Sequence, residues 1–399
     1  MNEGDGMICH FEVKSFKSLR EASLDFGNIN IFIGANGAGK TNILEALGVV
    51  SAAAYGIVDD ETLLRRGIRP GVPRLYKTSN QAYPISPHIS FAVADEHCRY
   101  DVSLLNPLEK PQPRWHFKTE KVSSDGVETY SRGIRSNINP ENGSVPALLA
   151  SPTVPRSVSG FLSEIRDYAL YNPNTPALRG LIPDQQARIP VGLSGGGLSD
   201  GLQDLLDLAK TDDDVEDAIV AVEALFDWVG DIATSTQNSR ILSPSLSRTK
   251  RTITFKDAYM KDKYNRLTAA DASEGILYAL FLTVLCLSPS GPKVFSIDNI
   301  DQALNPRLVK SLMQLLQEWF SEMIPEKQLF CTAHNPVVLD SLDMHDNRVH
   351  LYVVDRNSNG LTSVRQIKLT EALLEKSKEK HIPLSQMWVD GYIGGVPSV

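Results

Sequence analysis

Hydrophobic and polar positions in the first hundred residues follow the patterns of short strands. Residues 28–33 form a β-branched run that ends just before a glycine, and residues 41–54 read as a helix. The strands are predicted at residues 7–16, 24–26, 28–33, 88–93 and 100–105. Residues 7–16 alternate loosely, and we expect an antiparallel subdomain at the N-terminus.

The middle of the chain has a loop-rich composition first and helical apolar spacing after it. Proline, glycine and serine dominate residues 106–155, which predicts loops or an irregular insertion. Apolar residues then recur at helical spacing over 158–170 and 198–228. Because no heptad repeat is sustained there, we expect a compact, mostly helical insertion and not a coiled-coil arm.

The C-terminal third alternates between strand and helix. Strands are predicted at 252–255, 294–297 and 328–332, helices at 274–287 and 306–320, and a terminal hairpin at 349–354 and 361–367. Such βαβ alternation predicts a mainly parallel sheet covered by helices. The expected fold class is therefore α/β.

Composition narrows the class of protein without identifying a function. Of the 399 residues, 42% are hydrophobic and 22% are charged, which are ordinary globular values. Cys9, Cys98, Cys286 and Cys331 form no CxxC pair, so we expect reduced thiols and no zinc site. The longest apolar run, residues 275–287, is too short to span a bilayer, and no signal peptide is evident, so a cytoplasmic protein without membrane contact is expected.

The net charge of −8 argues against a surface coated for nucleic acid, but two local clusters are basic. One lies at residues 248–266 and the other at residues 65–77. Their members are Arg248, Lys250, Arg251, Lys256, Lys261, Lys263 and Arg266, and Arg65, Arg66, Arg69, Arg74 and Lys77. Solvated faces and a phosphate-binding surface both explain them, so DNA or another nucleic acid stays open as a partner.

The string GANGAGKT at residues 34–41 matches the phosphate-binding loop in full and lies between a strand and a helix. Glycines let backbone N–H groups surround phosphates, Lys40 reaches the outer phosphates, and the Thr41 hydroxyl can ligate magnesium. ATP and Mg²⁺ are therefore the expected ligands. The candidate nucleotide-binding residues here are Gly34, Asn36, Gly37, Ala38, Gly39, Lys40, Thr41 and Asn42.

A phosphate-binding loop needs a second strand that delivers an acid to the metal. The apolar run at 294–297 ends in Asp298, which we predict to hold magnesium together with Thr41.

Five strings occur in the order found in one family of ATPases. They are FKSL, INIFIGANGAGKTNILEAL, DASEGILYAL, SIDNIDQALNPRL and FCTAHNPVVLDSL. The chain resembles ABC-type ATPase heads of the SMC and RecF kind, and more closely the compact bacterial AAA-like (AAA_21-type) ATPases of phage-defence systems. The resemblance implies an ATPase head with an N-terminal lobe at 1–135, an insertion at 136–249, a C-terminal lobe at 250–370 and a tail at 371–399.

Such heads form homodimers that sandwich ATP, and a signature segment of one subunit closes over the nucleotide of the other. LSGGG at 193–197 looks more like the usual signature string than the segment containing Ser273 and Gly275 does. The signature must open the helix before the metal-acid strand, and this order selects Ser273 and Gly275. LSGGG then reads as a flexible glycine hinge.

The resemblance also implies a catalytic set at the ends of the later strands. His334 stands where the family places a histidine that contacts the γ-phosphate. The family's catalytic Glu, directly after the metal-side Asp298, is replaced by Asn299. An amide cannot take a proton from water, so slow hydrolysis is expected unless Asp301 substitutes as the base.

The resemblance favours an ATPase that dimerises around ATP and controls a separate effector, a nuclease or toxin, in antiphage defence. The 65 residues after His334 contain no acidic cluster typical of a fused nuclease domain. Two alternatives remain, a RecF-like DNA-binding repair ATPase and a non-hydrolysing ATP-dependent scaffold. The glutamine loop of such heads cannot be placed, although Gln81 is available. Trp388 and Tyr392 in the tail are expected to pack on the head, with docking of a partner as the alternative.

Overall fold

The computed structural model of the protein describes residues 7–133, 136–184, 186–236, 251–367 and 383–393. Its contacts divide the chain into two compact units. The first unit comprises Met1–Leu170, Pro292–Ile300 and Pro325–Val399, and the second comprises Tyr171–Gly291 and Asp301–Ile324. The chain therefore crosses between the units four times.

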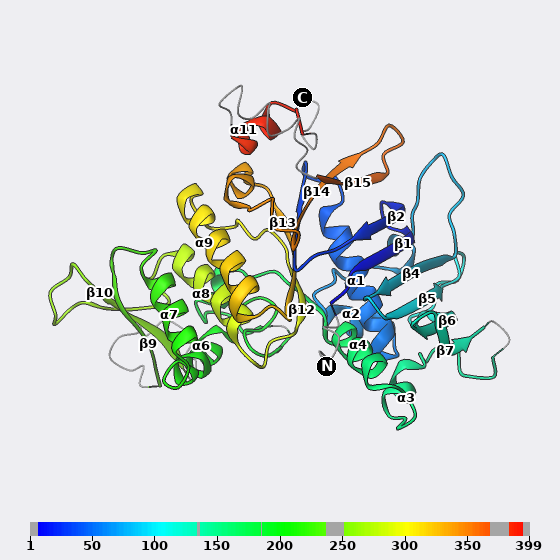
Figure 1. Cartoon of the computed structure of the whole chain (residues 1–399), viewed down its shortest axis with the longest axis horizontal. Coiled ribbons are helices and arrows are strands. Elements are labelled where there is room, and N and C mark those ends of the chain that lie inside the picture. The colour runs from blue at the N-terminus through cyan, green and yellow to red at the C-terminus, as the bar shows by residue number, and fades with distance from the viewer. Residues whose placement is uncertain (1–6, 134–135, 185, 237–250, 368–382, 394–399) are drawn as a thin grey trace. The chain divides into compact units, whose positions relative to one another are not determined.

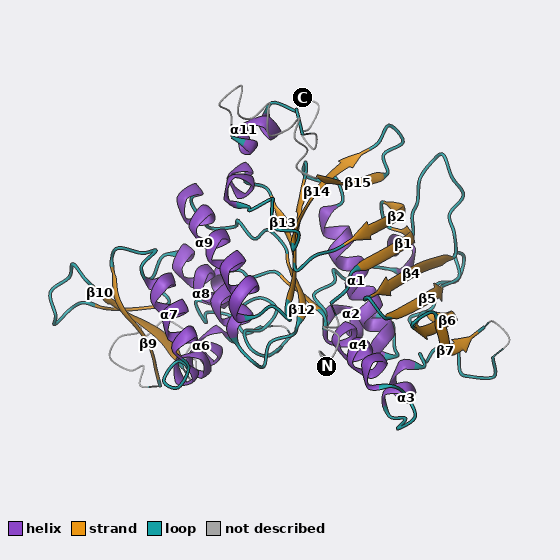
Figure 2. Cartoon of the chain, in the orientation of Figure 1, coloured by secondary structure: helices purple, strands orange, loops and turns teal. Residues whose placement is uncertain are grey.

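An antiparallel sheet forms one layer of the first unit (Figures 1 and 2). Its strand order is β2-β1-β4-β5-β6-β7. The strands are β1 (His10–Phe16), β2 (Leu19–Asp25), β4 (His88–Ala94), β5 (Cys98–Leu105), β6 (His116–Ser124) and β7 (Val127–Arg132). Alternate residues such as Phe11, Val13 and Val102 are buried on one face, as their sequence spacing predicts.

Two strands of this sheet overturn the prediction that residues 106–155 lack regular structure. β6 and β7 pair as a hairpin in which Ser124 lies opposite Val127. Asp125 and Gly126 form the turn, with φ of 49° and 76°. An Asp-Gly pair is a typical two-residue hairpin turn, so the proline- and serine-rich flanks concealed a recognisable signal.

The second sheet has the strand order β15-β14-β3-β13-β12-β8. β14, β3, β13 and β12 run parallel, whereas β15 is antiparallel to β14, so the predicted α/β fold with a mainly parallel sheet and an antiparallel N-terminal subdomain is confirmed. Its strands are β3 (Ile29–Ile33), β8 (Ala169–Tyr171), β12 (Val294–Ile297), β13 (Gln328–Ala333), β14 (Val349–Arg356) and β15 (Thr362–Ile367).

Helix α1 (Lys40–Tyr55) packs against both sheets of the first unit. Residues all round the helix are buried, because one side contacts β1 and β4 and another contacts β13. The other helical segments of this unit are α2 (Asp60–Leu64), η1 (Pro73–Tyr76), α3 (Val145–Leu149), α4 (Arg156–Asp167), η3 (Pro336–Ser341) and α11 (Leu384–Val389).

The second unit is mostly helical and includes a three-stranded antiparallel sheet of order β11-β10-β9. Its strands are β9 (Val229–Ser235), β10 (Thr252–Asp257) and β11 (Arg266–Thr268). Its helical segments are α5 (Thr175–Leu178), α6 (Leu198–Leu208), α7 (Asp213–Glu223), α8 (Glu274–Leu287), α9 (Pro306–Glu318) and the π-helical turn η2 (Trp319–Met323). Helix α8 is buried along almost its whole length, and α5, α6 and α7 pack on it.

The C-terminal helix α11 packs on η3 within the first unit. The Ser385 hydroxyl donates to Asp340 Oδ2 at 2.5 Å, and the Trp388 side chain is buried. Trp388 therefore packs on the head as expected, whereas Tyr392 is 54% exposed. Among the described residues, no helix is both long enough and apolar enough to cross a membrane.

Candidate functional site

The ends of three parallel strands meet at one edge of the second sheet. The glycine-rich loop follows β3, Asp298 follows β12 and His334 follows β13, which lies between the other two. In a parallel sheet the carboxyl ends of the strands share an edge, so strand order alone brings these three segments together.

The loop at residues 34–41 has the backbone conformation that its glycines allow. Gly34 and Gly39 have φ of +152° and +111°, which L side chains rarely adopt. A Cβ on Gly34 would lie 2.1 Å from the Val354 carbonyl oxygen, and one on Gly39 would lie 2.2 Å from Thr362 Oγ1. Glycine is therefore required at both positions by close packing as well as by conformation.

Lys40 turns back over this loop from the first residue of α1. Its Nζ donates to the carbonyl oxygens of Gly34 at 2.7 Å and Ala35 at 3.2 Å, and lies 3.4 Å from His334 Nδ1. The side chain is buried, whereas His334 and Asn36 are exposed. Lys40 and His334 thus lie together over the loop.

Thr41 and Asp298 face each other directly. The Thr41 hydroxyl lies 3.1 Å from both carboxylate oxygens of Asp298. The Thr332 hydroxyl, on β13, donates to Asp298 Oδ1 at 2.6 Å and accepts from the Asn299 backbone N–H at 2.8 Å. The three strand ends are therefore linked by side chains, and Thr332 is a site residue that sequence reasoning did not find.

Asn299 adopts the left-handed backbone conformation, with φ of 59°. Asparagine tolerates this conformation better than most residues. The boundary between the two units falls just after Ile300, so Asp301 belongs to the second unit. In that unit Asn305 caps α9 by accepting from the Leu308 N–H at 3.0 Å.

The backbone of the glycine-rich loop is braced by residues distant in sequence. Arg356 Nε donates to the Gly37 carbonyl at 2.8 Å, and the Thr362 hydroxyl donates to the Ala38 carbonyl at 2.6 Å. Ser18 lies 2.6 Å from Thr362 Oγ1 and accepts from Asn42 Nδ2 at 2.7 Å. The terminal hairpin and the β1–β2 turn therefore both hold the glycine-rich loop in place.

A buried carboxylate stands behind the loop on α1. Glu45 is fully buried, and it pairs with Lys17 Nζ at 2.5 Å and Arg69 Nε at 2.7 Å. Burial by itself would raise the pKa of Glu45, but hydrogen bonds and charges from Arg69 and Lys17 outweigh it, so the pKa lies below its usual value. Burial conversely lowers the pKa of Lys17.

The basic cluster at residues 65–77 does not form one continuous surface, because two of its five cations are buried. Arg66 is buried and donates to the Ser51 hydroxyl at 2.7 Å. Lys77 is also buried and donates to the Asn106 carbonyl. These cations hold the first unit together internally, while Arg69 contacts Glu45 and Asn42 beside the loop.

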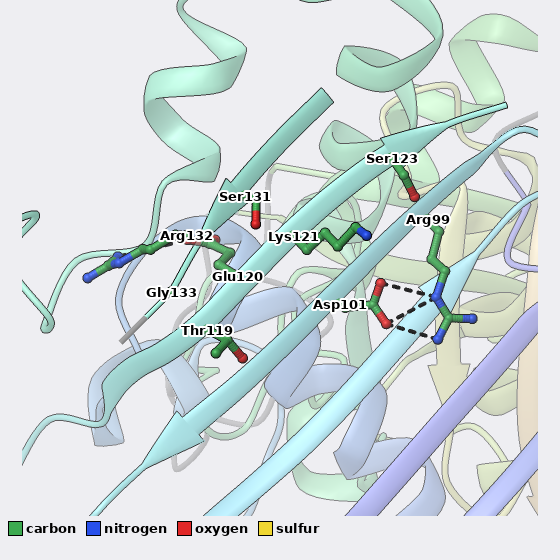
Figure 3. Close-up of a pocket in the computed structure, with 9 residues that line it drawn as sticks. All are labelled: Arg99, Asp101, Thr119, Glu120, Lys121, Ser123, Ser131, Arg132 and Gly133. Carbon is green, nitrogen blue, oxygen red and sulfur yellow. Dashed lines mark hydrogen bonds and ion pairs between the residues drawn. The ribbon is translucent and has the colours of Figure 1, made fainter. Parts of the chain in front are cut away.

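The antiparallel sheet has a polar depression of about 560 Å³ on β5, β6 and β7 (Figure 3). Arg99 and Asp101 point toward each other there, with Nη2 and Oδ1 2.9 Å apart. Arg99 Nη2 also donates to Glu12 Oε1 at 3.0 Å. Two carboxylates therefore already neutralise the Arg99 guanidinium in this depression.

Ser273 and Gly275 lie at the start of α8 in the second unit. Ser273 is the exposed N-cap residue, and Gly275 is buried. Arg179 Nη2 donates to the Ala272 carbonyl at 3.1 Å, and the Thr175 hydroxyl donates to Glu274 Oε1. The segment YNPNTPALRG thus supports the start of α8 from both sides of Ser273.

LSGGG is not the flexible hinge that its glycines suggested. The N–H groups of Ser194 and Gly196 donate to Asp184 Oδ2 at 2.8 and 3.2 Å. Gly195 has φ of +96° and packs against Leu178 and Phe281. A carboxylate and close packing fix this turn, which leads into α6.

The protein matches known proteins at several levels. The family model described as "AAA domain, putative AbiEii toxin, Type IV TA system" (AAA_21) matches residues 29–340. The chain is 33% identical over 69 residues to the DNA replication and repair protein RecF of Leifsonia xyli, and 39% identical over 62 residues to that of Lactobacillus gasseri. The match to the first protein covers 17% of this chain and 18% of that protein's length, and the match to the second covers 15% and 17%. Both matches are therefore confined to a small part of each chain.

Two solved SMC heads share the fold. One is bound to the C-winged helix domain of ScpA, with a TM-score of 0.53 and 15% identity over 92% of this chain and 99% of that chain. The other has an extended coiled coil and is bound to the C-terminal domain of ScpA derived from Pyrococcus furiosus, with a TM-score of 0.52 and 13% identity over 94% of this chain and 99% of that chain.

The parallel strand ends, the glycine-rich loop and the SMC-like fold define an ATPase head of the ABC type, in the SMC and RecF group. Within that group the chain belongs to the AAA_21 family, whose model matches more than three quarters of its length. It is thus a nucleotide-binding ATPase by family.

The residues present fit the nucleotide and magnesium that this family implies. Helix α1 begins without a side-chain cap, and its first turn has no acidic residue. A Cβ added to Gly37 would meet nothing within 4 Å, so the outer face of the loop is open. Uncapped N–H groups and the helix dipole favour phosphate there, and the Thr41 hydroxyl and Asp298 carboxylate supply hard oxygen ligands for Mg²⁺.

Proposed function

We propose that this protein is a homodimeric, ATP-operated switch that hydrolyses ATP slowly and controls a separate effector. The observation that carries the proposal is the hydrogen-bonded series Thr41, Asp298, Thr332 and Asn299. This series supports a magnesium site at Thr41 and Asp298, with the amide of Asn299 directly after the proposed metal-side acid.

In this mechanism Lys40 and the N–H groups of the loop bind the phosphates, and bound Mg²⁺ would neutralise their charge from Thr41 and Asp298. Asn299 can orient a water through its amide but cannot accept its proton. His334, beside Lys40, contacts the outer phosphate. Loss of a general base costs on the order of 10²–10⁴-fold in rate, so the ATP-closed dimer persists for a long time before each turnover reopens it.

Dimer closure requires a second surface, for which we propose Ser273 and Gly275 of the partner copy. An exposed serine at the start of α8, with the buried Gly275 behind it, suits a phosphate contact by a hydroxyl and helix N–H groups. Because the closed dimer presents a surface that the open monomers lack, a protein that binds only the closed form is controlled by ATP.

The proposed effector is a nuclease or toxin of a bacterial antiphage system. The family description, which names a putative AbiEii toxin of a Type IV toxin–antitoxin system, supports the defence role in this proposal. A cytoplasmic location is part of the same proposal.

Sedimentation velocity combined with an ATPase assay tests the switch. We expect a dimer with ATP and Mg²⁺, monomers with ADP, and turnover of roughly 0.1 s⁻¹ or less, about 10²-fold below the ~10 s⁻¹ of a typical enzyme. Lys40→Ala, which cannot hold the outer phosphates, serves as the control that stays monomeric. A wild-type protein that is monomeric under saturating ATP would contradict the proposal.

A further inference from the structure

One turn in the second unit combines exposed aromatic rings with exposed cations. It joins β10 to β11 and extends beyond the end of the three-stranded sheet (Figure 1). We call residues 256–266 the tyrosine hairpin. It lies in the basic cluster at 248–266, of which residues 248–250 fall outside the described part of the chain.

Two tyrosines of the hairpin are exposed to an unusual degree. Tyr259 is 76% exposed and Tyr264 is 73% exposed, the highest values of any aromatic side chain in the described residues. Most large aromatic side chains of this protein, such as Tyr100 and Tyr278, are buried. Core packing therefore does not account for the two rings, and each has a free face.

The cations of the hairpin are exposed while its acids shape the turn. Lys256, Lys261, Lys263 and Arg266 are all exposed, and no ion pair engages them within the described ranges. Asp257 accepts from the backbone N–H groups of Tyr259 at 2.8 Å and Met260 at 3.0 Å. Asp262 accepts from the buried Asn265 at 3.4 Å. The hairpin is locally positive although the chain's net charge is −8.

The strand register places two cations directly opposite each other, and binding of an anion would reduce their repulsion. Lys256 of β10 lies directly opposite Arg266 of β11, and like charges in that position destabilise a sheet. On the other side Lys256 lies opposite Asp231 of β9, so the row contains two cations and one acid. An anionic ligand over this row would remove the excess positive charge.

We propose that the tyrosine hairpin binds single-stranded nucleic acid, with Tyr259 and Tyr264 stacking on bases and the lysines and Arg266 holding phosphates. Stacking on exposed rings together with a basic track is how proteins bind single strands without sequence preference. A duplex keeps its bases stacked inside and gives two isolated rings nothing to stack on. An acidic protein would engage the cations and leave the rings unused.

This inference goes beyond the ATP switch, since it concerns a surface that holds no nucleotide-site residue. Fluorescence anisotropy with the full chain and a labelled oligothymidylate of about 15 nucleotides tests it. We expect Tyr259→Ala and Tyr264→Ala each to weaken binding about fivefold or more, and the Phe replacements to retain it. Lys261→Gln and Lys263→Gln should each reduce the slope of log K against log salt by about 0.7.

Matched substitutions at other sites show whether weaker binding is specific to the tyrosine hairpin or follows from the loss of any exposed tyrosine or lysine. Tyr392→Ala removes another exposed tyrosine and Lys110→Gln another exposed lysine, and both should bind the oligonucleotide as the wild type does. Melting temperatures should not change, because the substituted side chains are exposed. The proposal is overturned if Tyr259→Ala and Tyr264→Ala bind normally, if a duplex competes as well as the single strand, or if polyglutamate binds equally well.

Discussion

Thr332 fixes Asn299 through its backbone, because the Asn299 N–H donates to Thr332 Oγ1 at 2.8 Å. The same hydroxyl donates its own proton to Asp298 at 2.6 Å. One side chain of β13 therefore sets the position of both the metal-side acid and the residue after it, although both residues follow β12.

Replacing Thr332 by Val removes this hydroxyl without changing the volume of the buried side chain much. Asp298 loses an oriented hydrogen bond, and loss of such a support typically lowers metal affinity by about 10–100-fold. We expect the Mg²⁺ concentration needed for tight ATP binding to rise by that factor in a Mg²⁺ titration. Thr332→Ser keeps the hydroxyl and should behave almost as the wild type; equal Mg²⁺ dependence in all three proteins would contradict the assigned role.

The buried ion pairs of Glu45 predict a specific dependence of stability on pH. The pKa of Glu45 in the folded protein lies below the ordinary glutamate value of 4.5, because Arg69 and Lys17 stabilise the carboxylate. As pH falls, the unfolded chain therefore takes up this proton first, so the contribution of Glu45 to the free energy of unfolding is complete above about pH 4.5 and disappears as pH falls through the folded pKa.

Glu45→Gln should consequently lower the free energy of unfolding near pH 7 by about 3–5 kcal/mol, since Lys17 and Arg69 lose a buried partner. The deficit relative to wild type should shrink as the pH is lowered below 4.5 in urea unfolding experiments. Glu21, which pairs with Lys14 at an exposed position, provides the comparison: Glu21→Gln should cost no more than about 1 kcal/mol. A deficit for Glu45→Gln that is constant from pH 7 to pH 3 would refute the linkage.

Sequence patterns predicted the elements of the parallel sheet well, because a buried parallel strand and a buried helix both leave long apolar runs. The predicted helix 274–287 and strand 294–297 coincide with α8 and β12. The β6–β7 hairpin was missed, since its strands are polar on the exposed face and lie among prolines and serines. Only Asp125 and Gly126 marked its turn.

The site residues also fall into those that the sequence predicted and those that it missed. Motifs located the residues on the glycine-rich loop, Asp298 and His334, because each directly follows a strand. Ser18 and Thr362, which brace the loop, are 344 positions apart in sequence, and nothing in either neighbourhood indicates that they touch. Contacts across a sheet depend on strand order, which hydrophobic periodicity does not reveal.

The choice of Ser273 over LSGGG makes a prediction about dimerisation. Ser273 is exposed at the start of α8, so Ser273→Arg fits sterically in one subunit but would obstruct a nucleotide held by another. We expect this variant to bind ATP normally in calorimetry and to remain monomeric with ATP in sedimentation velocity. Ser194→Arg places the same side chain in LSGGG and should dimerise as the wild type does; the reverse outcome would assign the signature to LSGGG.

Asn299 is the residue proposed to keep ATP hydrolysis slow, so that ATP binding acts as a switch. Asn299→Glu adds a proton acceptor directly after the metal-side acid, and steady-state ATPase should rise by at least about tenfold, within the range for a general base. ATP affinity should hardly change, because Asn299 is not among the phosphate-binding residues. The ATP-bound dimer should also dissociate sooner, since each turnover reopens it.

A matched variant distinguishes the effect of the added proton acceptor from the effect of a changed backbone conformation at residue 299. Asn299 has φ of 59°, and a longer side chain there costs roughly 1–2 kcal/mol of conformational energy. Asn299→Gln carries the same cost and the same length as Asn299→Glu but has no base, so it should not accelerate hydrolysis. An equal rise in both variants would attribute the effect to the loop conformation.

Asp301→Ala completes the test, because Asp301 is the other carboxylate close in sequence to the metal-side acid. If Asp301 supplies the weak base of the wild type, its loss should remove the residual ATPase, and Asn299→Glu in the same chain should restore it. If Asp301→Ala leaves the wild-type rate unchanged and that rate is several turnovers per second, well above the ~0.1 s⁻¹ expected of a base-deficient site, then a base lies elsewhere and the slow-switch proposal is wrong.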